Sequence, residues 1–353
     1  MRAVRLHGAH DLRLTRIPAP GDPKAGEVVL DIRAVGLCGS DLHLYEQGRI
    51  GPMLPAQPFV LGHEFMGVVK RAGPESRDAL GAPLRAGTRV VVEPHVACGH
   101  CEWCEAGHPN LCPHNIFFGL NPTDGALSER LLVPARQCFP LPKSISDGAG
   151  ALLETLGVAL HAVDLAKLQL GRTVVVAGCG PVGLLIVRLA HLAGVGRLIA
   201  VDPLARRTQQ AKRWGATEVI TARIEEILPE LRSYTGPRGA DTVFESAWAG
   251  PAISACLAVA SPGAKVVLVG IPPDDSCSFV HSEARRKGLT LLFSRRMKHV
   301  LPRAIQFASG RAPLIPLDEL VTHHWPLADT ARAFSQNARY ADGVIKTIIG
   351  PHR

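Results

Sequence analysis

From residue 173 onward, strand-like and helix-like segments alternate, and this alternation constrains the fold more than any other feature of the sequence. Short apolar runs rich in valine and isoleucine, such as TVVVAG and RLIAVD, each precede a longer segment with helical periodicity, such as PVGLLIVRLAHLAG and LARRTQQAKRWG. Parallel strands need crossover connections of this kind, and the helices that supply them cover both faces of the sheet. The sequence therefore predicts an α/β domain with a doubly wound parallel sheet of the Rossmann type.

The first of these strands runs into GCGPVG at residues 178–183, which matches the dinucleotide-binding pattern G-x-G-x-x-G. In that pattern Gly178 makes a tight turn, Gly180 lets the backbone approach a pyrophosphate, and Gly183 allows the helix to pack closely on the strand. The helix that follows presents unpaired N–H groups to the phosphates. Asp202 ends the next strand, where a carboxylate accepts hydrogen bonds from ribose hydroxyls and repels a 2′-phosphate, which favours NAD over NADP.

The length of 353 residues makes two domains the default, and the 46% hydrophobic and 20% charged residues are ordinary for a soluble globular protein. The first part of the chain is rich in glycine and proline and carries short apolar runs such as EVVLDIRAVG and RVVVEP, which indicate a loop-rich β domain. We therefore expect a first domain over residues 1–150, the Rossmann domain over 151–290, and a return of the chain to the first domain over 291–353.

The formal net charge is +8, but the basic residues are scattered and form no tail or recognition motif, so nucleic-acid binding is not expected. The N-terminus, MRAVRLHGAHDLRL, lacks the apolar region of an export signal. The most apolar stretch is interrupted by glycines, Pro181 and Arg188, which argues against a membrane span. We expect a cytoplasmic, reducing setting and neither a membrane nor a nucleic-acid partner.

Four of the nine cysteines fall within residues 98–112, CGHCEWCEAGHPNLC, with the spacing C-x2-C-x2-C-x7-C. Disulfides, an iron–sulfur cluster and a tetrahedral metal site are the three candidates for such a loop. A reducing compartment counts against disulfides. Cys112 precedes a proline, as in ferredoxin-type clusters, but the x7 gap is longer than the x3 of that pattern. The loop therefore favours a closed structural zinc site formed by Cys98, Cys101, Cys104 and Cys112.

A second group of metal-ligand residue types lies outside that loop. Cys38 stands in GLCGSD, His63 and Glu64 stand in VLGHEF, and Glu154 stands in ALLETLGVALHA. A lone cysteine or histidine is usually a packed core residue. A cysteine, a histidine and two acids in a chain that also carries a dinucleotide motif indicate a catalytic metal site instead.

Across essentially its whole length the chain resembles the zinc-dependent medium-chain alcohol dehydrogenases, and within them the sorbitol (L-iditol) and related polyol dehydrogenases. The resemblance is carried by CGSDLHLYEQGRIG at 38–51, VLGHEFMGVV at 60–69, the cysteine loop, GCGPVG at 178–183 and LVTHHWPLADTARAF at 320–334. It implies a GroES-like β-rich catalytic domain beside the Rossmann domain, two zinc ions per chain, and NAD as the cofactor. It also implies a homo-oligomer, either a tetramer or a dimer.

Carried over position by position, the resemblance makes Cys38 and His63 direct ligands of a catalytic zinc ion. Glu64 would be a further ligand, directly or through water, and Glu154 would be a nearby carboxylate that exchanges with a water ligand. Asp41 would support the His63 imidazole from its far side and fix its tautomer.

The resemblance also assigns the proton path, the substrate contacts and the cofactor contacts. Ser40 matches the hydroxyl that hands on the alcohol proton, with His43 as the onward acceptor. The substrate contacts would be Tyr45, Phe118 and Arg296. The nucleotide contacts would be Gly178, Gly180, Pro181, Val182, Gly183, Asp202, Arg207, Val269 and Gly270.

The chain departs from polyol dehydrogenases in ways that leave the substrate open. Leu44 replaces an aromatic residue common in relatives, and all four loop cysteines are kept, as in threonine dehydrogenases. Arg206 and Arg207 could in principle meet a 2′-phosphate, which Asp202 would repel. We predict oxidation of a secondary hydroxyl of a polyol to a ketone, with hydride transfer to NAD⁺. An L-threonine 3-dehydrogenase or another secondary-alcohol dehydrogenase is the runner-up, and a non-catalytic nucleotide-binding relative is the alternative of another class.

Overall fold

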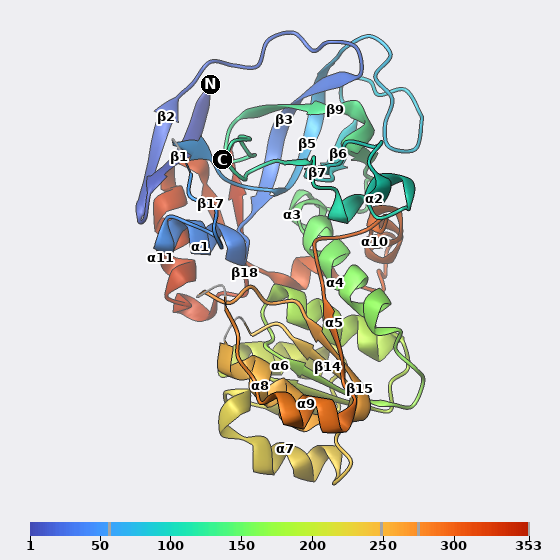
Figure 1. Ribbon diagram of the computed structural model, residues 1–353. Helices are drawn as coiled ribbons and strands as arrows, with labels where there is room; N and C mark the ends of the chain where they lie inside the picture. Colours follow the sequence, from blue (N-terminus) through green and yellow to red (C-terminus); the bar gives the residue numbers. More distant parts are fainter. Residues whose placement is uncertain (56–57, 248–249, 274–275, 352–353) are drawn as a thin grey trace. The chain divides into compact units, whose positions relative to one another are not determined.

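The computed structural model describes residues 1–55, 58–247, 250–273 and 276–351 (Figure 1). The chain divides into two compact units, one made of Met1–Glu154 with Lys298–Arg353 and the other of Thr155–Met297. The boundaries expected from the sequence, after residues 150 and 290, lie shortly before these divisions, and the assignment of the three ranges to domains stays a prediction. Among the described residues, no helix has the length and apolar character needed to cross a bilayer.

The second unit is built on a six-stranded sheet in the order β13-β12-β11-β14-β15-β16, in which every neighbouring pair is parallel. Its strands are β11 Thr173–Ala177, β12 Arg197–Val201, β13 Glu218–Ile220, β14 Ala240–Glu245, β15 Ala260–Leu268 and β16 Thr290–Phe293. Its helices are α5 Pro181–Leu192, α6 Ala205–Arg213, α7 Leu228–Thr235, α8 Gly250–Val259 and α9 His281–Lys287, and α4 Leu153–Ala166 leads into it. The doubly wound parallel sheet predicted from the alternation is confirmed.

The central strand shows why this sheet forms. Val174, Val175 and Val176 are all fully buried, although successive side chains of a strand point to opposite faces. Both faces must therefore be covered by helices, as in a sheet made of right-handed β-α-β crossovers. Each fully buried valine contributes about 1.5 to 3 kcal/mol of transfer free energy, so the continuous valine run anchors the core of this unit.

The first unit carries a seven-stranded sheet in the order β10-β6-β5-β3-β18-β17, with β9 also paired to β3. These strands are β3 Glu27–Gly36, β5 Glu64–Ala72, β6 Arg89–Val92, β9 Arg130–Pro134, β10 Cys138–Pro140, β17 Val321–Pro326 and β18 Lys346–Gly350. A smaller sheet joins β1 Arg2–Gly8, β2 Asp11–Arg16 and β4 Phe59–Val60, and a two-stranded ladder joins β7 His95–Val96 and β8 Ile116–Phe117. The helices are α1 Gly39–Gln47, α2 Glu102–Glu105, α3 Asp147–Ala151, α10 Leu301–Ala308 and α11 Thr330–Ala338.

The end of β3 is the point where distant parts of the first unit meet. Gly36 is paired with Glu64 of β5 on one side and with Ile348 of β18 on the other, both antiparallel. β18 is thereby inserted between β17 and β3, and β3 lies some three hundred residues earlier in the chain. This register decides which side chains come together at the site described next.

Candidate metal centre and dinucleotide site

The first cluster of metal-ligand side chains contains Cys38, His63 and Glu64, whose ligand atoms all lie within 4.8 Å of one another. Cys38 is the residue before α1, and Glu64 is the first residue of β5. His63 and Glu64 are buried, and Cys38 is half-buried. The structure thus brings together three of the four side chains predicted to hold a catalytic metal.

Asp41 joins two of these residues from outside the cluster. Its Oδ2 accepts a hydrogen bond from the Cys38 backbone N–H at 3.1 Å, and its Oδ1 lies 3.5 Å from His63 Nδ1. Burial by itself lowers the pKa of His63, but the charges of Asp41 and Cys38 outweigh burial and hold that pKa well above its usual range. With Nδ1 directed to a carboxylate, Nε2 is the atom left for a metal, as in carboxylate–histidine–metal triads.

Lys346 is the cationic neighbour of this cluster. Its ammonium forms an ion pair with Glu64 Oε2 and donates a hydrogen bond to the Leu37 carbonyl at 2.9 Å. Burial lowers the pKa of Lys346, but the negative charges of Glu64 and Cys38 outweigh it and the net pKa is raised. Lys346 and Glu64 are therefore a charged pair shielded from water.

Glu154 lies in the first turn of α4, outside the three-residue ligand group but inside its electrostatic field. Burial raises the pKa of its carboxyl group to about 7; the Glu64 charge also raises it, and His63 lowers it. The structure therefore places the fourth predicted ligand as a neighbour of the cluster, consistent with a carboxylate that exchanges rather than one that is always bound.

The charges of this group fit a divalent cation. Asp41, Glu64 and Glu154 are buried carboxylates, and with the Cys38 thiol they face one ammonium and one imidazole. An excess of buried negative charge is expensive unless a cation offsets it. Glu64 Oε1 is buried and accepts no hydrogen bond from the described residues, which leaves a ligand atom for that cation. A thiolate, an imidazole and a carboxylate are a donor set suited to zinc.

The second cluster is the cysteine loop. Sulfur–sulfur distances are 3.5 Å between Cys101 and Cys104, 3.5 Å between Cys98 and Cys112, 3.8 Å between Cys101 and Cys112, and 4.0 Å between Cys98 and Cys104. Four thiolates about 2.3 Å from one zinc ion at tetrahedral angles lie about 3.8 Å apart. The Cys98 N–H also donates to Cys112 Sγ at 3.4 Å, a contact that favours a thiolate. The loop therefore has the geometry of a closed four-thiolate site.

In the second unit, the predicted glycine turn follows β11 at the carboxyl edge of the parallel sheet. Gly178 has a φ of +87°, and a side chain there would strike the backbone of Ser246 and Ala247, which follow β14. A side chain at Gly183 would strike the Gly178 carbonyl, so glycine is what lets α5 start against the turn. Pro181 opens α5, with Gly180 as its N-cap and Val182 as its second residue. β11 and β14 are the neighbouring strands at which the strand order reverses, the usual place for a dinucleotide.

Asp202 lies at the same edge, directly after β12, and is 3% exposed. Its two carboxylate oxygens accept hydrogen bonds from the backbone N–H groups of Cys179 at 2.7 Å and Leu204 at 2.8 Å. Arg207 Nη1 lies 3.8 Å from the same carboxylate. Asp202 thus braces the glycine turn, and each oxygen retains lone pairs for ribose hydroxyls. Val269 and Gly270 follow β15 at the same edge, and both donate to the Glu245 carbonyl.

The residues predicted to carry the proton and to contact the substrate lie in different parts of the structure. Ser40 and His43 lie in α1 after Cys38, with Ser40 half-buried and His43 buried. Tyr45 packs its ring against His10 and Phe334, with centroids 4.9 Å and 5.4 Å away, and its contact with the substrate stays a prediction. Phe118 likewise packs edge-on against the core residue Phe65 at 6.4 Å. Arg296 belongs to the second unit and has a φ of +57°.

Three residues near the first cluster were not singled out from the sequence. The Phe117 ring lies 5.4 Å from the His63 ring and 6.5 Å from the His95 ring, so Phe117, rather than its neighbour Phe118, contacts the predicted ligand. Phe117 ends β8 and Phe118 is the turn residue after it, so the two rings meet different neighbours, which a motif match does not resolve. The third is Lys346, whose signal was available: a lysine in the apolar run VIKTIIG is out of pattern.

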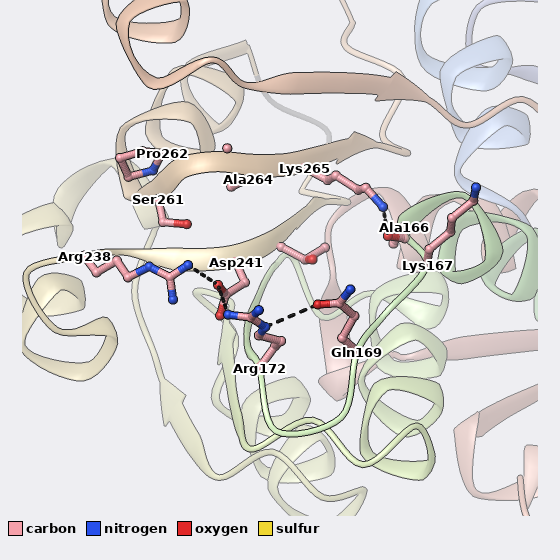
Figure 2. Close-up of a pocket in the computed structure, with 12 residues that line it drawn as sticks. Ala166, Lys167, Gln169, Arg172, Arg238, Asp241, Ser261, Pro262, Ala264 and Lys265 are labelled. Carbon is pink, nitrogen blue, oxygen red and sulfur yellow. Dashed lines mark hydrogen bonds and ion pairs between the residues drawn. The ribbon is translucent and has the colours of Figure 1, made fainter.

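A cavity of about 220 Å³ in the second unit lies at the other edge of the sheet, where β11, β14 and β15 begin (Figure 2). Within it Asp241 lies 3.0 Å from Arg238 and 3.5 Å from Arg172, and Lys265 donates to the Ala166 carbonyl at 2.8 Å. These contacts tie the strand starts to the end of α4. The cavity is therefore distinct from the glycine turn at the carboxyl edge.

Known protein families match the sequence of both units. The family model of the alcohol dehydrogenase GroES-like domain matches residues 24–143, and that of zinc-binding dehydrogenases matches residues 181–310. The chain is 34% identical to a sorbitol dehydrogenase of Bacillus subtilis, covering 100% of this chain and 98% of the relative. It is 36% identical to a probable D-xylulose reductase A of Arthroderma otae, covering 98% and 95%. Among solved structures, an alcohol dehydrogenase of Escherichia coli complexed with NADH has a TM-score of 0.86 at 28% identity, covering 99% of each chain.

Proposed function

The chain belongs to the zinc-dependent medium-chain alcohol dehydrogenase family, and we propose that it oxidises a secondary hydroxyl group of a polyol to a ketone, with hydride transfer to NAD⁺. The observation that carries this proposal is the cluster of Cys38, His63 and Glu64, with Asp41 behind the imidazole. A non-catalytic relative would have no need to keep this set of ligands intact. The sorbitol and xylulose relatives support a polyol as the substrate.

The residues of the first unit divide the work around the metal. Cys38 and His63 would hold a zinc ion there, whose Lewis acidity would favour loss of the substrate's hydroxyl proton at neutral pH. Asp41 holds His63 Nδ1 and thereby keeps Nε2 as the ligand atom. Ser40 accepts the hydroxyl proton of the substrate as it passes its own hydroxyl proton to His43, which stands three residues further along α1 and therefore on the same face of that helix.

The second unit binds the cofactor at the carboxyl edge of its sheet. The glycine turn and the start of α5 receive the pyrophosphate, because the first N–H groups of a helix have no partners within it. Asp202 accepts hydrogen bonds from the ribose hydroxyls, and its negative charge repels a 2′-phosphate. NAD is therefore the proposed cofactor. Arg207, held near Asp202, contacts the adenosine ribose. Hydride transfer itself is the chemistry of the nicotinamide, and the protein contributes orientation.

The cysteine loop holds the second zinc ion as a brace. Its four thiolates would supply all the ligands of that ion, which would leave no position for a substrate. The loop therefore contributes folding free energy rather than catalysis.

A substrate panel tests the proposal. NADH formation is measured by absorbance with sorbitol, xylitol, galactitol, butanediol and L-threonine, with NADP⁺ in a parallel series. Turnover of one or more polyols with NAD⁺ is expected. Activity on L-threonine alone would refute the polyol assignment in favour of an L-threonine 3-dehydrogenase, and activity on butanediol alone would favour a simple secondary-alcohol dehydrogenase.

The proposal also covers the oligomeric state and the cellular compartment. We propose a homo-oligomer, a dimer or a tetramer, supported by β16, which among the described residues is paired only with β15 and which carries Phe293, 72% exposed. A cytoplasmic setting is proposed because the loop thiols must stay reduced to hold a metal. Sedimentation velocity of the purified holoenzyme measures the oligomer, and a monomer would remove that part of the proposal.

A further inference from the structure

The cavity of the second unit lies at an edge of the sheet that the proposed reaction does not use. A doubly wound sheet binds its dinucleotide outside the carboxyl ends of the strands, where the glycine turn and Asp202 lie. The cavity lies at the opposite edge, where β11, β14 and β15 begin, and all of its lining residues belong to the second unit. Neither the cofactor nor either metal cluster accounts for its side chains.

The charged side chains that line this cavity are mainly cationic. Four of them are positive and one, Asp241, is negative, which leaves a net charge of +3; the cations are Lys167, Arg172, Arg238 and Lys265. Like charges gathered around one cavity repel one another, and a bound anion relieves that repulsion. The cavity therefore favours a ligand that carries more than one negative charge.

Asp241 orients two of these cations and leaves them hydrogen-bond donors. Its Oδ1 lies 3.0 Å from Arg238 Nη2 and 3.5 Å from Arg172 Nη1, and its Oδ2 accepts a hydrogen bond from the Thr173 N–H at 3.0 Å. Arg172 also donates to Gln169 Oε1 at 3.3 Å. Figure 2 shows both guanidinium groups reaching the same carboxylate. Each guanidinium has five N–H donors, so both arginines keep donors for a ligand.

A bulge at the start of β15 forms one wall of the cavity. Ala240 of β14 pairs with Ala260, but Thr242 pairs with Lys265, so residues 261–264 stand opposite a single residue of β14. A bulge of this kind interrupts the strand ladder and re-aims side chains, and bulges are frequent beside functional sites. The sheet therefore departs from regular pairing at the place where the cations gather.

The size of the cavity limits what the anion can be. Its volume is about 220 Å³. Pockets for drug-sized ligands begin at about 300 Å³, so a dinucleotide does not fit, whereas a phosphate group does. Arg172 and Arg238 are exposed, so the cavity opens to solvent and the remainder of a phosphate ester can extend outward.

We propose that this cavity is a second ligand site that binds a phosphate group, either as inorganic phosphate or as the phosphate ester of a small sugar. Arg172 and Arg238 donate to the phosphate oxygens through their guanidinium forks. Lys265 uses one N–H on the Ala166 carbonyl and gives the phosphate its other two. Asp241 holds the arginines and does not touch the ligand, which its charge would repel.

Isothermal titration calorimetry of the zinc-loaded enzyme tests the site. The enzyme is saturated with NADH, so that the glycine turn is occupied and does not take the probe. Inorganic phosphate, glucose 6-phosphate and unphosphorylated glucose are titrated separately at constant ionic strength, because salt screens exposed charges. The variants are Arg238→Gln, Arg238→Lys and Lys265→Met. Arg13→Gln is the matched control, because Arg13 is paired with Asp11 in the other unit and its side chain is 60% exposed, against 61% for Arg238.

The wild type and Arg13→Gln are expected to bind the phosphate probes and not glucose. Arg238→Gln and Lys265→Met are each expected to weaken phosphate binding by about tenfold or more, because each removes a charge-assisted hydrogen bond. Arg238→Lys is expected to lie between Arg238→Gln and the wild type, since it keeps the charge and loses the fork. Tighter binding of glucose 6-phosphate than of inorganic phosphate identifies a sugar phosphate as the ligand, and the reverse order identifies the free ion.

A wild type that binds neither phosphate probe would overturn the proposal. Wild-type affinity in either Arg238→Gln or Lys265→Met would also overturn it, since the phosphate would then bind elsewhere. An equal loss of affinity in Arg13→Gln would show attraction by net charge alone and would overturn it as well. Should Lys265→Met fail to fold, Arg238→Gln decides, because it changes an exposed side chain. The assay uses no turnover, so a chain that binds phosphate here and oxidises no polyol would refute only the proposed function.

Discussion

The cysteine loop draws its four sulfur atoms from residues 98–112. The Cys38 cluster instead joins the residue before α1 to the start of β5, and its cationic neighbour Lys346 is the first residue of β18. Three loop cysteines are half-buried and the loop can close on a metal through local turns alone. The Cys38 cluster depends on the pairing of Gly36 with Glu64 and with Ile348, so it exists only after the sheet has formed. In the cysteine loop, where all ligands are close in sequence, metal binding helps the chain to fold. In the Cys38 cluster, where strand pairing brings the ligands together, the fold sets the geometry in which the metal is bound.

The largest effect is expected from Cys38→Ser. Loss of the thiolate removes the Lewis acid, worth several kcal/mol of barrier, so turnover should fall by about a thousandfold or more. Metal analysis should give one zinc ion per chain instead of two, with thermal unfolding close to that of the wild type. Cys277→Ser is the matched control, because Cys277 is exposed and lies outside both clusters. Retention of full activity by Cys38→Ser would break the comparison.

Cys98→Ser should give the opposite pattern. The loop loses its metal and with it folding free energy on the order of several kcal/mol. Denaturant unfolding of the holoenzyme measures the loss, and the fraction that remains folded should keep turnover per folded molecule. If turnover per folded molecule fell as far as in Cys38→Ser, the two clusters could not be separated into brace and catalyst.

Asp41→Asn is expected to have an intermediate effect, limited to metal binding at the Cys38 cluster. The amide removes the charge that faces His63 Nδ1 at 3.5 Å while keeping nearly the same shape. Metal affinity at the first cluster should fall by about 10- to 100-fold, as for other partners of ligating histidines, and the cysteine loop should keep its zinc. Competition with a chelator, followed by zinc analysis, resolves the two ions. Equal loss of both ions would contradict the assignment.

The smallest effect is expected from Ser146→Ala, which changes neither cluster. Ser146 Oγ accepts a hydrogen bond from the Ala149 N–H at 3.0 Å and caps α3, and it donates to Asp318 at 2.6 Å. Loss of such a cap reduces the free energy of unfolding by about 1 kcal/mol. Both zinc ions and turnover should be unchanged, so this variant shows how much destabilisation the catalytic cluster tolerates. If Ser146→Ala also lost zinc, zinc content would depend on the overall stability of the protein rather than on the ligands of each cluster.

Much of the fold and of the site was predictable because the signals were local. The strand before Gly178 and the turn after it are read from adjacent residues, and the parallel order follows from the need for crossovers. The spacing of the loop cysteines likewise specified a four-thiolate geometry. The sequence left side-chain direction open. The Tyr45 and Phe118 rings pack against Phe334 and Phe65, partners far along the chain, and the contact of Tyr45 and Phe118 with the substrate stays a prediction.

The amino-acid sequence by itself determined the Rossmann sheet, the glycine turn and the cysteine loop, since each is encoded within a short stretch whose periodicity or spacing has one stable solution. Only the tertiary structure decided that Lys346 faces Glu64 and that Phe117 lies on His63. Those contacts arise from strand register, in which a shift of one residue would turn every side chain to the other face. Strand register is fixed by the burial of the whole sheet. The sequence motifs around Lys346 and Phe117 therefore do not specify it.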